Sequence, residues 1–426
     1  MKKLTVGFVG LSHLGICSLL SVASKNFKVY GLDNDIEKID LFKKKITNIK
    51  EKNLDKYLNK YFKNITFTSN YNNLSNCNII YISQDVTTDS LGNSKLINVT
   101  KYINKALKFL NKNACLVILC QVPPGFTRKI KWPQRQLFYQ VETLIFGNSI
   151  KRASFPERII IGTHSLALNK KSNLSILLNS FKCPIIPMSY ESAELCKISI
   201  NMLLIANVTT ANILSELCEK IGANWSQIVP ALRLDKRIGK YAYINTGLGL
   251  SGGNLERDLT SLSKLVIKKS SSSKVINAFM HNSEINKKWI IDLFKEKSLK
   301  LKKNSKIGIL GLTYKENTHS IKNSPSIDLI NKISFKKIYC YDPNADLKDV
   351  SLNINRCDNI KSVIKGTDIL VLMTKWKEFD NITKDMLILL MKGKIIIDPF
   401  GILRDLKLNN FGFEYFTKGV RINYEK

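Results

Sequence analysis

A glycine turn between a strand and a helix begins this chain and constrains its fold more than any other feature. The short apolar stretch 4–9 is rich in β-forming residues, residues 10–15 read Gly-Leu-Ser-His-Leu-Gly, and 14–23 has helical character. A second strand at 28–32 is followed by Asp33. In dinucleotide-binding folds, glycines allow a tight turn beside the pyrophosphate, and an acid about 20 residues later binds the ribose. The sequence therefore predicts a dinucleotide-binding domain at this end of the chain.

The residues of this turn also indicate which dinucleotide is bound. Gly10 and Gly15 supply two of the expected glycines, and Ser12 stands where the middle one is expected. Serine is small, and its hydroxyl can donate a hydrogen bond to phosphate. Asp33 favours NAD over NADP, because its carboxylate would repel a 2′-phosphate. The alternative is a helix-packing turn in an unrelated α/β protein.

Strand and helix signals alternate in both outer thirds of the chain. Further strands are expected at 78–83 and 114–119, and a second series begins at 307–310 and continues at 337–341, 368–373 and 394–397. Short apolar strands separated by helices predict parallel sheets with right-handed crossovers. We therefore expect an α/β protein in which two Rossmann-like, doubly wound parallel-sheet domains flank a helical middle domain.

One long helix is expected in that middle domain. Residues 189–221 contain neither glycine nor proline, and Gly222 provides a stop. Helical patterns continue to about residue 300, and 268–274 (KKSSSSK) is expected to be a mobile surface turn. The predicted domains are 1–185 for NAD, 186–302 for the helical centre and 303–426 for the second α/β domain.

Charge and cysteine usage narrow the class of protein. The 426-residue chain carries a formal net charge of +32, but its lysines are scattered and no nucleic-acid-binding motif appears, so we expect no nucleic-acid partner. The nine cysteines form no C-x-x-C pair, which indicates reduced thiols in a cytoplasmic protein. Four dispersed histidines predict no metal site, and no run of 18 apolar residues suggests a membrane span.

A second glycine-rich segment lies in the helical middle. Residues 245–253, here called the glycine loop, include Gly247, Gly249, Gly252 and Gly253, and the charged run Glu-Arg-Asp follows at 256–258. Glycine at this density lets the backbone adopt positive φ and come close to a ligand. The sequence predicts a ligand-binding loop here.

Ordered motifs along nearly the whole chain resemble those of the UDP-glucose/GDP-mannose dehydrogenase family. Besides the N-terminal turn, the acidic run after 33 and the glycine loop, they are Thr87-Thr88-Asp89, 122–125 (VPPG), 141–144 (VETL), 156–159 (PERI), Lys197 with Asn201, 235–239 (DKRIG) and 311–315 (GLTYK). The resemblance implies NAD as cofactor, a nucleotide sugar (a UDP-sugar by preference) as substrate, and a homodimer built on the long helix.

The resemblance also implies the residues of the site. The catalytic set is Lys197, Asn201, Asp258, Glu142, Asn254 and Gln121. The cofactor set is Gly10, Ser12, His13, Leu14, Gly15, Asp33, Lys38, Thr88 and Gln121. The substrate set is Glu142, Lys197, Asn201, Arg237, Gly249, Gly253 and Lys315. Lys197 and Asn201 share one helix face at i and i+4. Asp258 is either a general base or simply an acid near a helix N-terminus.

The chain departs from the family pattern at its nucleophile. Asn254 occupies the position of the family's catalytic cysteine, Arg257 that of a lysine, and Gln121 that of a threonine. An amide cannot form the covalent intermediate that a thiolate forms. Three hypotheses remain: full oxidation of an alcohol to an acid through an aldehyde hydrate, a single oxidation to an aldehyde or ketone, and a non-catalytic protein that binds nucleotide sugars. We expect full oxidation.

Overall fold

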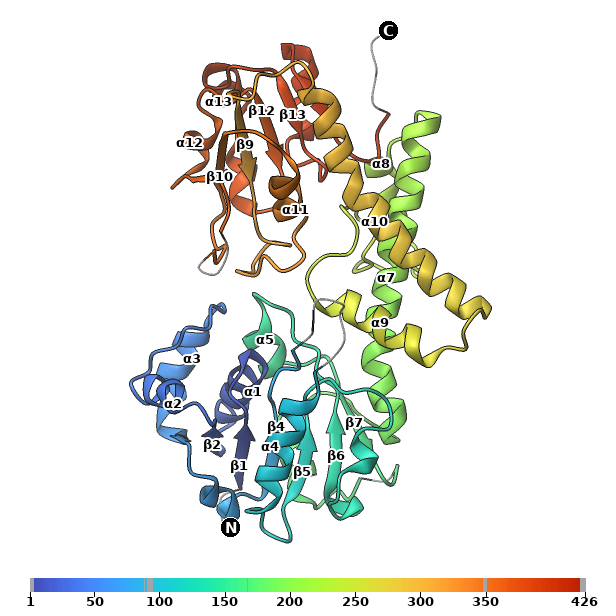
Figure 1. Cartoon of the computed structure of the whole chain (residues 1–426). Coiled ribbons are helices and arrows are strands. Elements are labelled where there is room, and N and C mark those ends of the chain that lie inside the picture. The colour runs from blue at the N-terminus through green and yellow to red at the C-terminus, as the bar shows by residue number, and fades with distance from the viewer. Residues whose placement is uncertain (1–3, 88, 90–94, 167, 348–350, 422–426) are drawn as a thin grey trace. The chain divides into compact units, whose positions relative to one another are not determined.

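The chain folds into α/β units, as the alternating pattern predicts. The computed structural model describes residues 4–87, 89, 95–166, 168–347 and 351–421. Contacts divide the chain into two compact units, Met1–Ile200 and Asn201–Lys426, and each contains a largely parallel sheet covered by helices (Figure 1). The division into three domains at 185 and 302 stays a prediction.

The first unit is built on an eight-stranded sheet in the order β3-β2-β1-β4-β5-β6-β7-β8. Its strands are β1 Thr5–Val9, β2 Lys28–Leu32, β3 Ile65–Thr68, β4 Ile79–Ile82, β5 Cys115–Ile118, β6 Leu137–Gln140, β7 Ile159–Thr163 and β8 Ile185–Met188. Its helices are α1 His13–Ala23, α2 Ile36–Lys43, α3 Leu54–Tyr61, α4 Ile97–Leu107, α5 Ser149–Ser154 and α6 Asn173–Asn179. The first six strands follow the doubly wound order of a dinucleotide-binding sheet.

One strand pair in this sheet is antiparallel, whereas the alternating pattern predicts parallel strands only. β6 pairs with β7 in the antiparallel sense, with Tyr139 opposite Gly162. The segment between them contains only the short helix α5, which packs against α1 and does not return the chain to the opposite edge of the sheet. The residues just after β6 therefore stay at the carboxyl edge of the parallel strands, where ligands of such sheets bind.

Apolar side chains cover both faces of the first sheet. One buried cluster joins strand residues such as Phe8 and Val117 to α1, α3, α5 and α6. The other joins Val9 and Ile80 to α4 and to the start of the long helix α7 (Tyr190–Ile221). Strands buried on both faces are typical of doubly wound sheets. The core thus fixes the carboxyl edge of β1, β2 and β4, from which the cofactor turn extends.

The second unit repeats the strand order of the first. Its six parallel strands lie in the order β11-β10-β9-β12-β13-β14. The strands are β9 Lys306–Leu310, β10 Lys337–Tyr341, β11 Asn355–Arg356, β12 Ile369–Leu372, β13 Ile395–Ile397 and β14 Glu414–Phe416, and the helices beside them are α11 Pro325–Lys332, α12 Ile360–Ile364 and α13 Lys384–Leu390. The two sheets are the Rossmann-like sheets that the sequence predicts.

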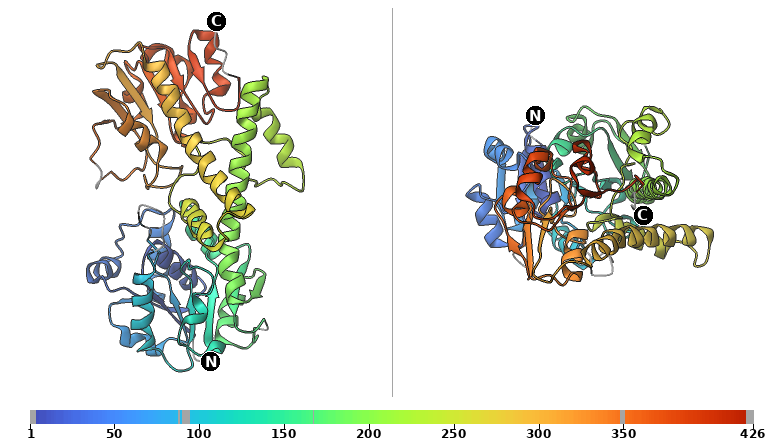
Figure 2. Two further views of the ribbon diagram at one scale, coloured as in Figure 1. Left: turned by 45° about the vertical axis from the view of Figure 1, so that its right-hand side comes forward. Right: turned by 90° about the horizontal axis from the view of Figure 1, so that it is seen from above.

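The middle of the chain is helical. Helix α7 spans Tyr190–Ile221, which confirms the predicted long helix, and α8 Trp225–Leu234, α9 Asn254–Leu265 and α10 Ser271–Ser298 follow it (Figure 2). The prediction of a mobile turn at 268–274 is wrong for its second half, because Ser270 caps α10 by accepting a hydrogen bond from the backbone N–H of Ser273. A serine run can therefore begin a helix as well as interrupt one.

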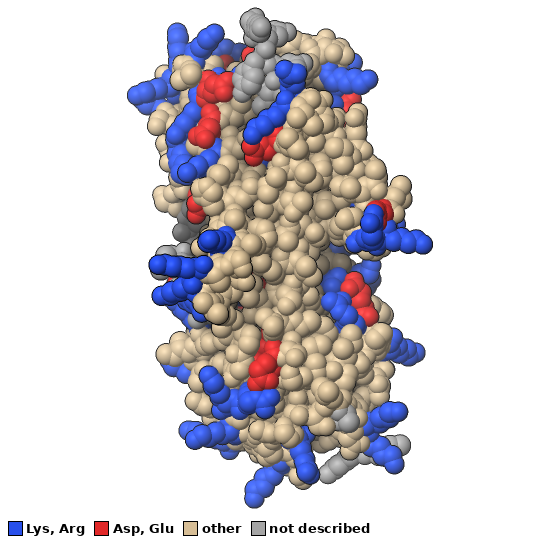
Figure 3. All heavy atoms as spheres, turned by 90° about the vertical axis from the view of Figure 1, so that its right-hand side faces the viewer, with Lys and Arg blue, Asp and Glu red and all other residues tan. Residues whose placement is uncertain are grey.

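The face drawn in Figure 3 shows scattered basic side chains, and one helix is a weak candidate for a membrane span. On the face drawn in Figure 3, lysine and arginine side chains stand singly or in small groups around a broad uncharged area. Among the described residues, α7 is the one helix long and apolar enough to cross a membrane, with 39% of its most apolar window buried. Core helices of water-soluble proteins pass the same test, so this finding is weak evidence for a membrane span.

Candidate active site

The two glycines of the N-terminal turn are required by close backbone packing. Gly10 has φ +93°, and a Cβ atom added to it would lie 2.7 Å from the Cβ atom of Gln84. A Cβ atom at Gly15 would lie 2.0 Å from the carbonyl oxygen of Gly10. Larger residues would therefore push α1 away from β1. The glycines keep the start of α1 against the turn, where a pyrophosphate binds in this type of fold.

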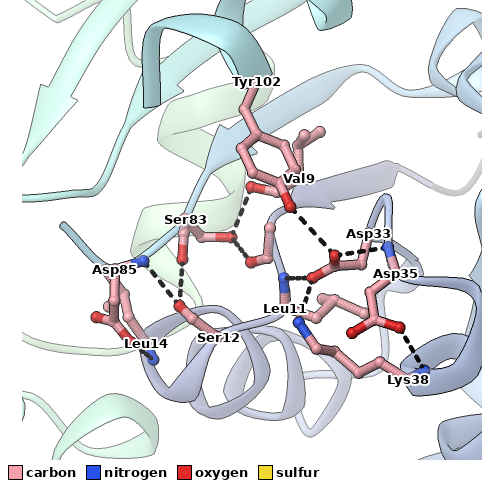
Figure 4. Close-up of polar contacts among 11 residues, drawn as sticks. Val9, Leu11, Ser12, Leu14, Asp33, Asp35, Lys38, Ser83, Asp85 and Tyr102 are labelled. Atoms are coloured by element: carbon pink, nitrogen blue, oxygen red, sulfur yellow. Dashed lines mark hydrogen bonds and ion pairs between the residues drawn. The ribbon is translucent and has the colours of Figure 1, made fainter. Parts of the chain in front are cut away.

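Ser12 connects the turn to the end of β4. Its hydroxyl donates to the carbonyl oxygen of Ser83 (3.1 Å) and accepts from the backbone N–H of Asp85 (2.9 Å), as Figure 4 shows. The Ser83 hydroxyl in turn donates to the carbonyl oxygen of Gly10 (2.9 Å). A glycine at position 12 could make neither of the two bonds of the Ser12 hydroxyl. Serine here therefore fixes the shape of the turn.

Asp85 is a polar residue of this turn that the sequence did not single out. It is exposed, and its Oδ2 atom accepts a hydrogen bond from the backbone N–H of Leu14 at 3.3 Å. Leu14 lies in the first turn of α1, so the carboxylate stands where the helix dipole and free N–H groups attract anions. Asp85 lies beside the N-terminal turn because β4 pairs with β1, and the sequence alone did not indicate that pairing.

Asp33 lies at the end of β2 with four hydrogen-bond donors around it. Oδ2 accepts from the backbone N–H of Leu11 (2.8 Å) and from Lys38 Nζ (3.0 Å), and Oδ1 accepts from the backbone N–H of Asp35 (3.1 Å) and the Tyr102 hydroxyl (3.1 Å). Burial by itself raises the pKa of this carboxyl, but the bonds from Leu11, Asp35 and Lys38 hold it below its ordinary value. Asp33 is thus an ionised acceptor at the predicted ribose position.

These features fit a dinucleotide. The glycines keep the start of α1 packed close to the turn, and Asp33 presents acceptor oxygens at the carboxyl edge of the sheet. The Lys38 side chain is 34% exposed, so it can yield its place on Asp33 to a ribose hydroxyl. A carboxylate at this place disfavours a 2′-phosphate, which agrees with NAD.

His13 is engaged with the protein itself. Its Nε2 atom lies 3.0 Å from Glu51 Oε2, and its ring packs against Phe146 with centroids 4.3 Å apart. Glu51 is fully buried and also accepts from the backbone N–H groups of Gly147 and Ser149, at the start of α5. The side chain of His13 therefore joins α1 to the segment after β6. Its contact with a cofactor stays a prediction.

The loop that carries Gln121 is fastened to helix α7. Gln121 is half-buried just after β5, and Glu194 of α7 accepts from the backbone N–H groups of Gly125 (2.5 Å) and Thr127 (2.8 Å). Glu194 is completely buried and was not singled out by the sequence. Cys120 is buried too, and burial raises the pKa of its thiol to about 12, so it is a poor substitute nucleophile. Thr88 lies outside the described residues.

Glu142 and Lys197 meet in the first unit. Glu142 follows β6, and its Oε2 atom lies 3.5 Å from Lys197 Nζ on α7. The side chains are 18% and 11% exposed, and Glu142 also accepts from the backbone N–H of Leu144. Glu142 and Lys197 are 55 positions apart in the sequence. The short β6–β7 connection and the packing of α7 on this sheet bring them together. Two of the predicted catalytic residues are therefore an ion pair with limited exposure to water.

Asn201 and Asp258 meet in the second unit. The Asn201 amide donates to Asp258 Oδ2 at 2.5 Å, and Arg257 Nε lies 3.3 Å from Asp258 Oδ1. All three side chains are buried, with Asp258 only 1% exposed. Asp258 lies near the start of α9 as a hydrogen-bonded carboxylate, and its predicted role as a general base stays a prediction. The neighbouring Arg257 keeps a positive charge beside this carboxylate.

The glycine loop is held by tight contacts within the second unit. A Cβ atom at Gly249 (φ +75°) would lie 2.4 Å from the carbonyl oxygen of Ser283, and one at Gly252 (φ +78°) would lie 2.7 Å from the Tyr314 ring. The added Cβ atom of Gly253 would lie 3.3 Å from the Lys322 side chain. The glycines therefore let the loop pack closely, and Asn254 begins α9 as an exposed residue.

Two further predicted substrate residues, Arg237 and Lys315, lie in the second unit. Arg237 follows α8, is 89% exposed and makes two bonds to Asp235, at 3.0 Å and 2.6 Å. Lys315 is half-buried and lies next to Tyr314, with Nζ 5.8 Å from that ring. Their substrate contacts stay predictions.

Three family models match successive parts of the chain. The NAD binding domain of the UDP-glucose/GDP-mannose dehydrogenase family matches residues 4–177, its central domain matches 191–287, and its UDP binding domain matches 308–405. The three matches follow the same order as the first sheet, the helical middle and the second sheet.

Individual proteins match over nearly the full length. The chain is 29% identical over 440 residues to the UDP-glucose 6-dehydrogenase of Rickettsia bellii, which covers 98% of this chain and 100% of that protein. A UDP-D-ManNAc dehydrogenase from Pyrococcus horikoshii has a similar structure, with TM-score 0.83 and 22% identity over 98% and 99% of the two chains. A UDP-glucose dehydrogenase from Pyrobaculum islandicum gives TM-score 0.84 and 19% identity over 98% of each chain. The structural likenesses concern the fold.

Proposed function

This chain belongs to the UDP-glucose/GDP-mannose dehydrogenase family, and we propose that within it the chain oxidises C6 of UDP-glucose to the uronic acid. The family makes it an NAD-dependent nucleotide-sugar dehydrogenase. The observation that carries the choice of substrate is the match to UDP-glucose 6-dehydrogenases of Rickettsia over 98% of the chain. The arrangement of the candidate site supports the reaction class.

The N-terminal turn holds the cofactor in this proposal. Backbone N–H groups at the start of α1 bind the pyrophosphate, with Gly10 and Gly15 allowing the approach, and Asp33 accepts from the ribose hydroxyls. Bound NAD supplies the acceptor for the hydride that leaves the sugar carbon. Lys38 shifts from Asp33 towards the cofactor when the ribose binds.

The two polar pairs, Glu142 with Lys197 and Asn201 with Asp258, carry out the proton transfers in this proposal. The alcohol loses its proton to a base and its hydride to NAD, which leaves an aldehyde. Asp258 is the proposed base, oriented by Asn201 and Arg257. Lys197, held by Glu142, stabilises the developing negative charge on oxygen, an effect that is strong where water is limited. Gly249, Gly253, Arg237 and Lys315 bind the nucleotide sugar.

The second oxidation must proceed without a thiol at position 254. In the favoured route water adds to the aldehyde, the hydrate loses a proton to Glu142 or Asp258, and a second hydride leaves for a second NAD, which gives the carboxylic acid. The alternative stops after one oxidation, because Asn254 has no nucleophile to hold the aldehyde. The two routes differ in the NADH formed for each sugar.

Absorbance of NADH tests the proposal directly. Purified protein is incubated with NAD and, separately, UDP-glucose, UDP-N-acetylmannosamine and GDP-mannose. We expect turnover with UDP-glucose and two NADH for each sugar consumed, measured by chromatography of the product. One NADH for each sugar identifies the single oxidation, preference for another nucleotide sugar replaces the proposed substrate, and absence of turnover with all three contradicts the proposal.

The variant Asn254→Cys tests whether the residue directly after the glycine loop lies close to the aldehyde carbon of the sugar. Asn254 is exposed at the first position of α9, and a helix N-terminus lowers the pKa of a thiol, so Cys at this position is expected to be reactive. Incubation with UDP-glucose and NAD should give a protein adduct with the mass of the sugar nucleotide. The matched control is Asn410→Cys, an exposed thiol in another turn, which should form no adduct. Equal labelling of both would place Asn254 outside the site.

A further inference from the structure

The glycine loop is tied at its base to a segment near the end of the chain. Residues 417–421, here called the C-terminal strap, follow β14, and Lys418 in the strap is 3% exposed. Lys418 Nζ donates to the carbonyl oxygen of Gly247 at 3.2 Å and to the side-chain oxygen of Asn286 on α10. Gly247 lies 171 residues before Lys418 in the sequence, so this contact exists only in the folded unit.

The strap itself is fixed to the helices that surround the loop. The backbone N–H of Gly419 donates to Glu219 of α7 at 2.8 Å, and its carbonyl accepts from the backbone N–H of Trp225 at 2.9 Å. Val420 forms a bridge with Asn224, just before α8. Gly419 has φ +76°, and a Cβ atom there would lie 2.8 Å from the Cβ atom of Trp225. The strap is therefore a fitted part of the unit.

The same helices hold the other side of the loop base. The indole N–H of Trp225 donates to the carbonyl oxygen of Ile244 at 3.0 Å, and Asn212 of α7 accepts from the backbone N–H of Gly247 at 3.0 Å. Both polar groups of the Gly247 backbone are thus satisfied by side chains, one by Asn212 and the other by Lys418. A half-buried carbonyl that loses its donor is destabilised, so removal of Lys418 should let this peptide turn.

We propose that the C-terminal strap positions the glycine loop, and that Lys418 is the positioning residue through its bond to Gly247. Lys418 acts on the reaction only through the loop, which is a proposed part of the sugar site. This inference rests on the proposed function for its kinetic consequence, but the order of the loop can be measured without any substrate.

The pKa of Lys418 makes the proposed contact dependent on pH. Burial lowers the pKa of Lys418 to about 8, against the opposing effect of Glu219 and Glu216. The pKa of Lys418 in the folded protein lies below that of an ordinary lysine, so folding disfavours its charged form. The resulting loss in the free energy of unfolding is fully present below about pH 8. The charged groups facing the site are Glu216 and Glu219 of α7 and Lys288, Asp292 and Glu296 of α10.

Hydrogen exchange of full-length variants tests the inference. In Lys418→Met, which keeps the apolar stem and removes the charge and donor, we expect amides of 245–253 to exchange about tenfold faster at pH 7. The melting temperature should change little, because removal of the buried charge offsets the cost of the unpaired Gly247 carbonyl, whereas loss of a merely structural residue would lower it. The control is Lys375→Met, which removes one exposed lysine from the same unit. Loop exchange no faster than in this control would overturn the proposal.

Two further measurements keep the test independent of one variant. In the wild type, loop protection corrected for intrinsic exchange should fall as the pH passes about 8, since the charged donor becomes neutral; unchanged protection up to pH 9.5 would count against the role of Lys418. If the protein turns over a nucleotide sugar, Lys418→Met should raise KM for that sugar about tenfold and change kcat less. Loss of activity with normal loop exchange would contradict the strap mechanism and leave the proposed function standing.

Discussion

At the scale of single residues, Asp85 has the clearest consequence for cofactor binding. Its carboxylate accepts from the Leu14 backbone N–H at 3.3 Å, at the helix end that the proposal assigns to the NAD pyrophosphate. Two anions at one helix N-terminus repel, and the charge of a group at this place is worth roughly 0.3–1 kcal/mol. Asp85→Asn should therefore bind NAD about two- to fivefold more tightly, as measured by calorimetry.

A matched control separates this local effect from a change in net charge. Asp40→Asn removes a charge from α2, where Asp40 is exposed and pairs with Lys43 at 3.0 Å. It should leave the Kd for NAD unchanged. Weaker binding by Asp85→Asn would mean that Asp85 supports the turn and does not compete with the cofactor.

Residue identities near the turn were predictable, but the pairings between them were not. Gly10, Gly15 and Asp33 fall within one strand–helix–strand unit, so their spacing along the chain shows their roles. The bonds of Ser12 to Asp85 and of Glu142 to Lys197 join residues 73 and 55 positions apart. Such pairs depend on the order of strands in the sheet, which local patterns do not contain. The family resemblance named Glu142 and Lys197 without their contact, and did not name Asp85.

At the scale of elements, the glycine loop offers a test with a control in the same loop. Gly249→Ala should lower the stability of the protein by roughly 1–2 kcal/mol for the positive φ alone, and further because the new Cβ atom would meet the Ser283 carbonyl at 2.4 Å. We expect a lower melting temperature and a raised KM for the nucleotide sugar. Gly247→Ala is the control, because none of the described atoms lies within 4 Å of its added Cβ atom. Equal effects of the two substitutions would contradict the packing argument.

The elements themselves followed from sequence more readily than their pairing. The strands at β2 and β10 and the helix α7 were expected within a residue of their observed bounds, because each has a strong periodic or apolar pattern. The antiparallel turn from β6 to β7 was not expected, since a buried strand has the same apolar pattern in either direction. That turn is what keeps Glu142 at the carboxyl edge of the sheet.

At the scale of the whole molecule, the chain contains two sheets of the same order but one suitable cofactor turn. Gly311 after β9 has φ +95°, as Gly10 has +93° after β1, and Asp342 ends β10 as Asp33 ends β2. In the second unit, however, Asp342 Oδ2 accepts from the backbone N–H groups of Leu312 and Thr313, the Thr313 hydroxyl and the Trp376 indole. The next helix, α11, begins only at Pro325, so the described residues directly after that turn do not begin a helix as they do after Gly10.

The difference between the turns after β1 and β9 therefore predicts one NAD site in each chain, located in the first unit. Calorimetry should give one NAD bound per chain. Asp33→Asn should weaken this binding about tenfold or more, because the ribose hydroxyls lose a charged acceptor, which is worth about 1.5–3 kcal/mol. Asp342→Asn should instead lower the melting temperature and leave the Kd for NAD unchanged, since its carboxylate accepts hydrogen bonds from described residues of the second unit. Two NAD bound per chain, or a changed Kd in a folded Asp342→Asn variant, would show that the second turn also binds cofactor.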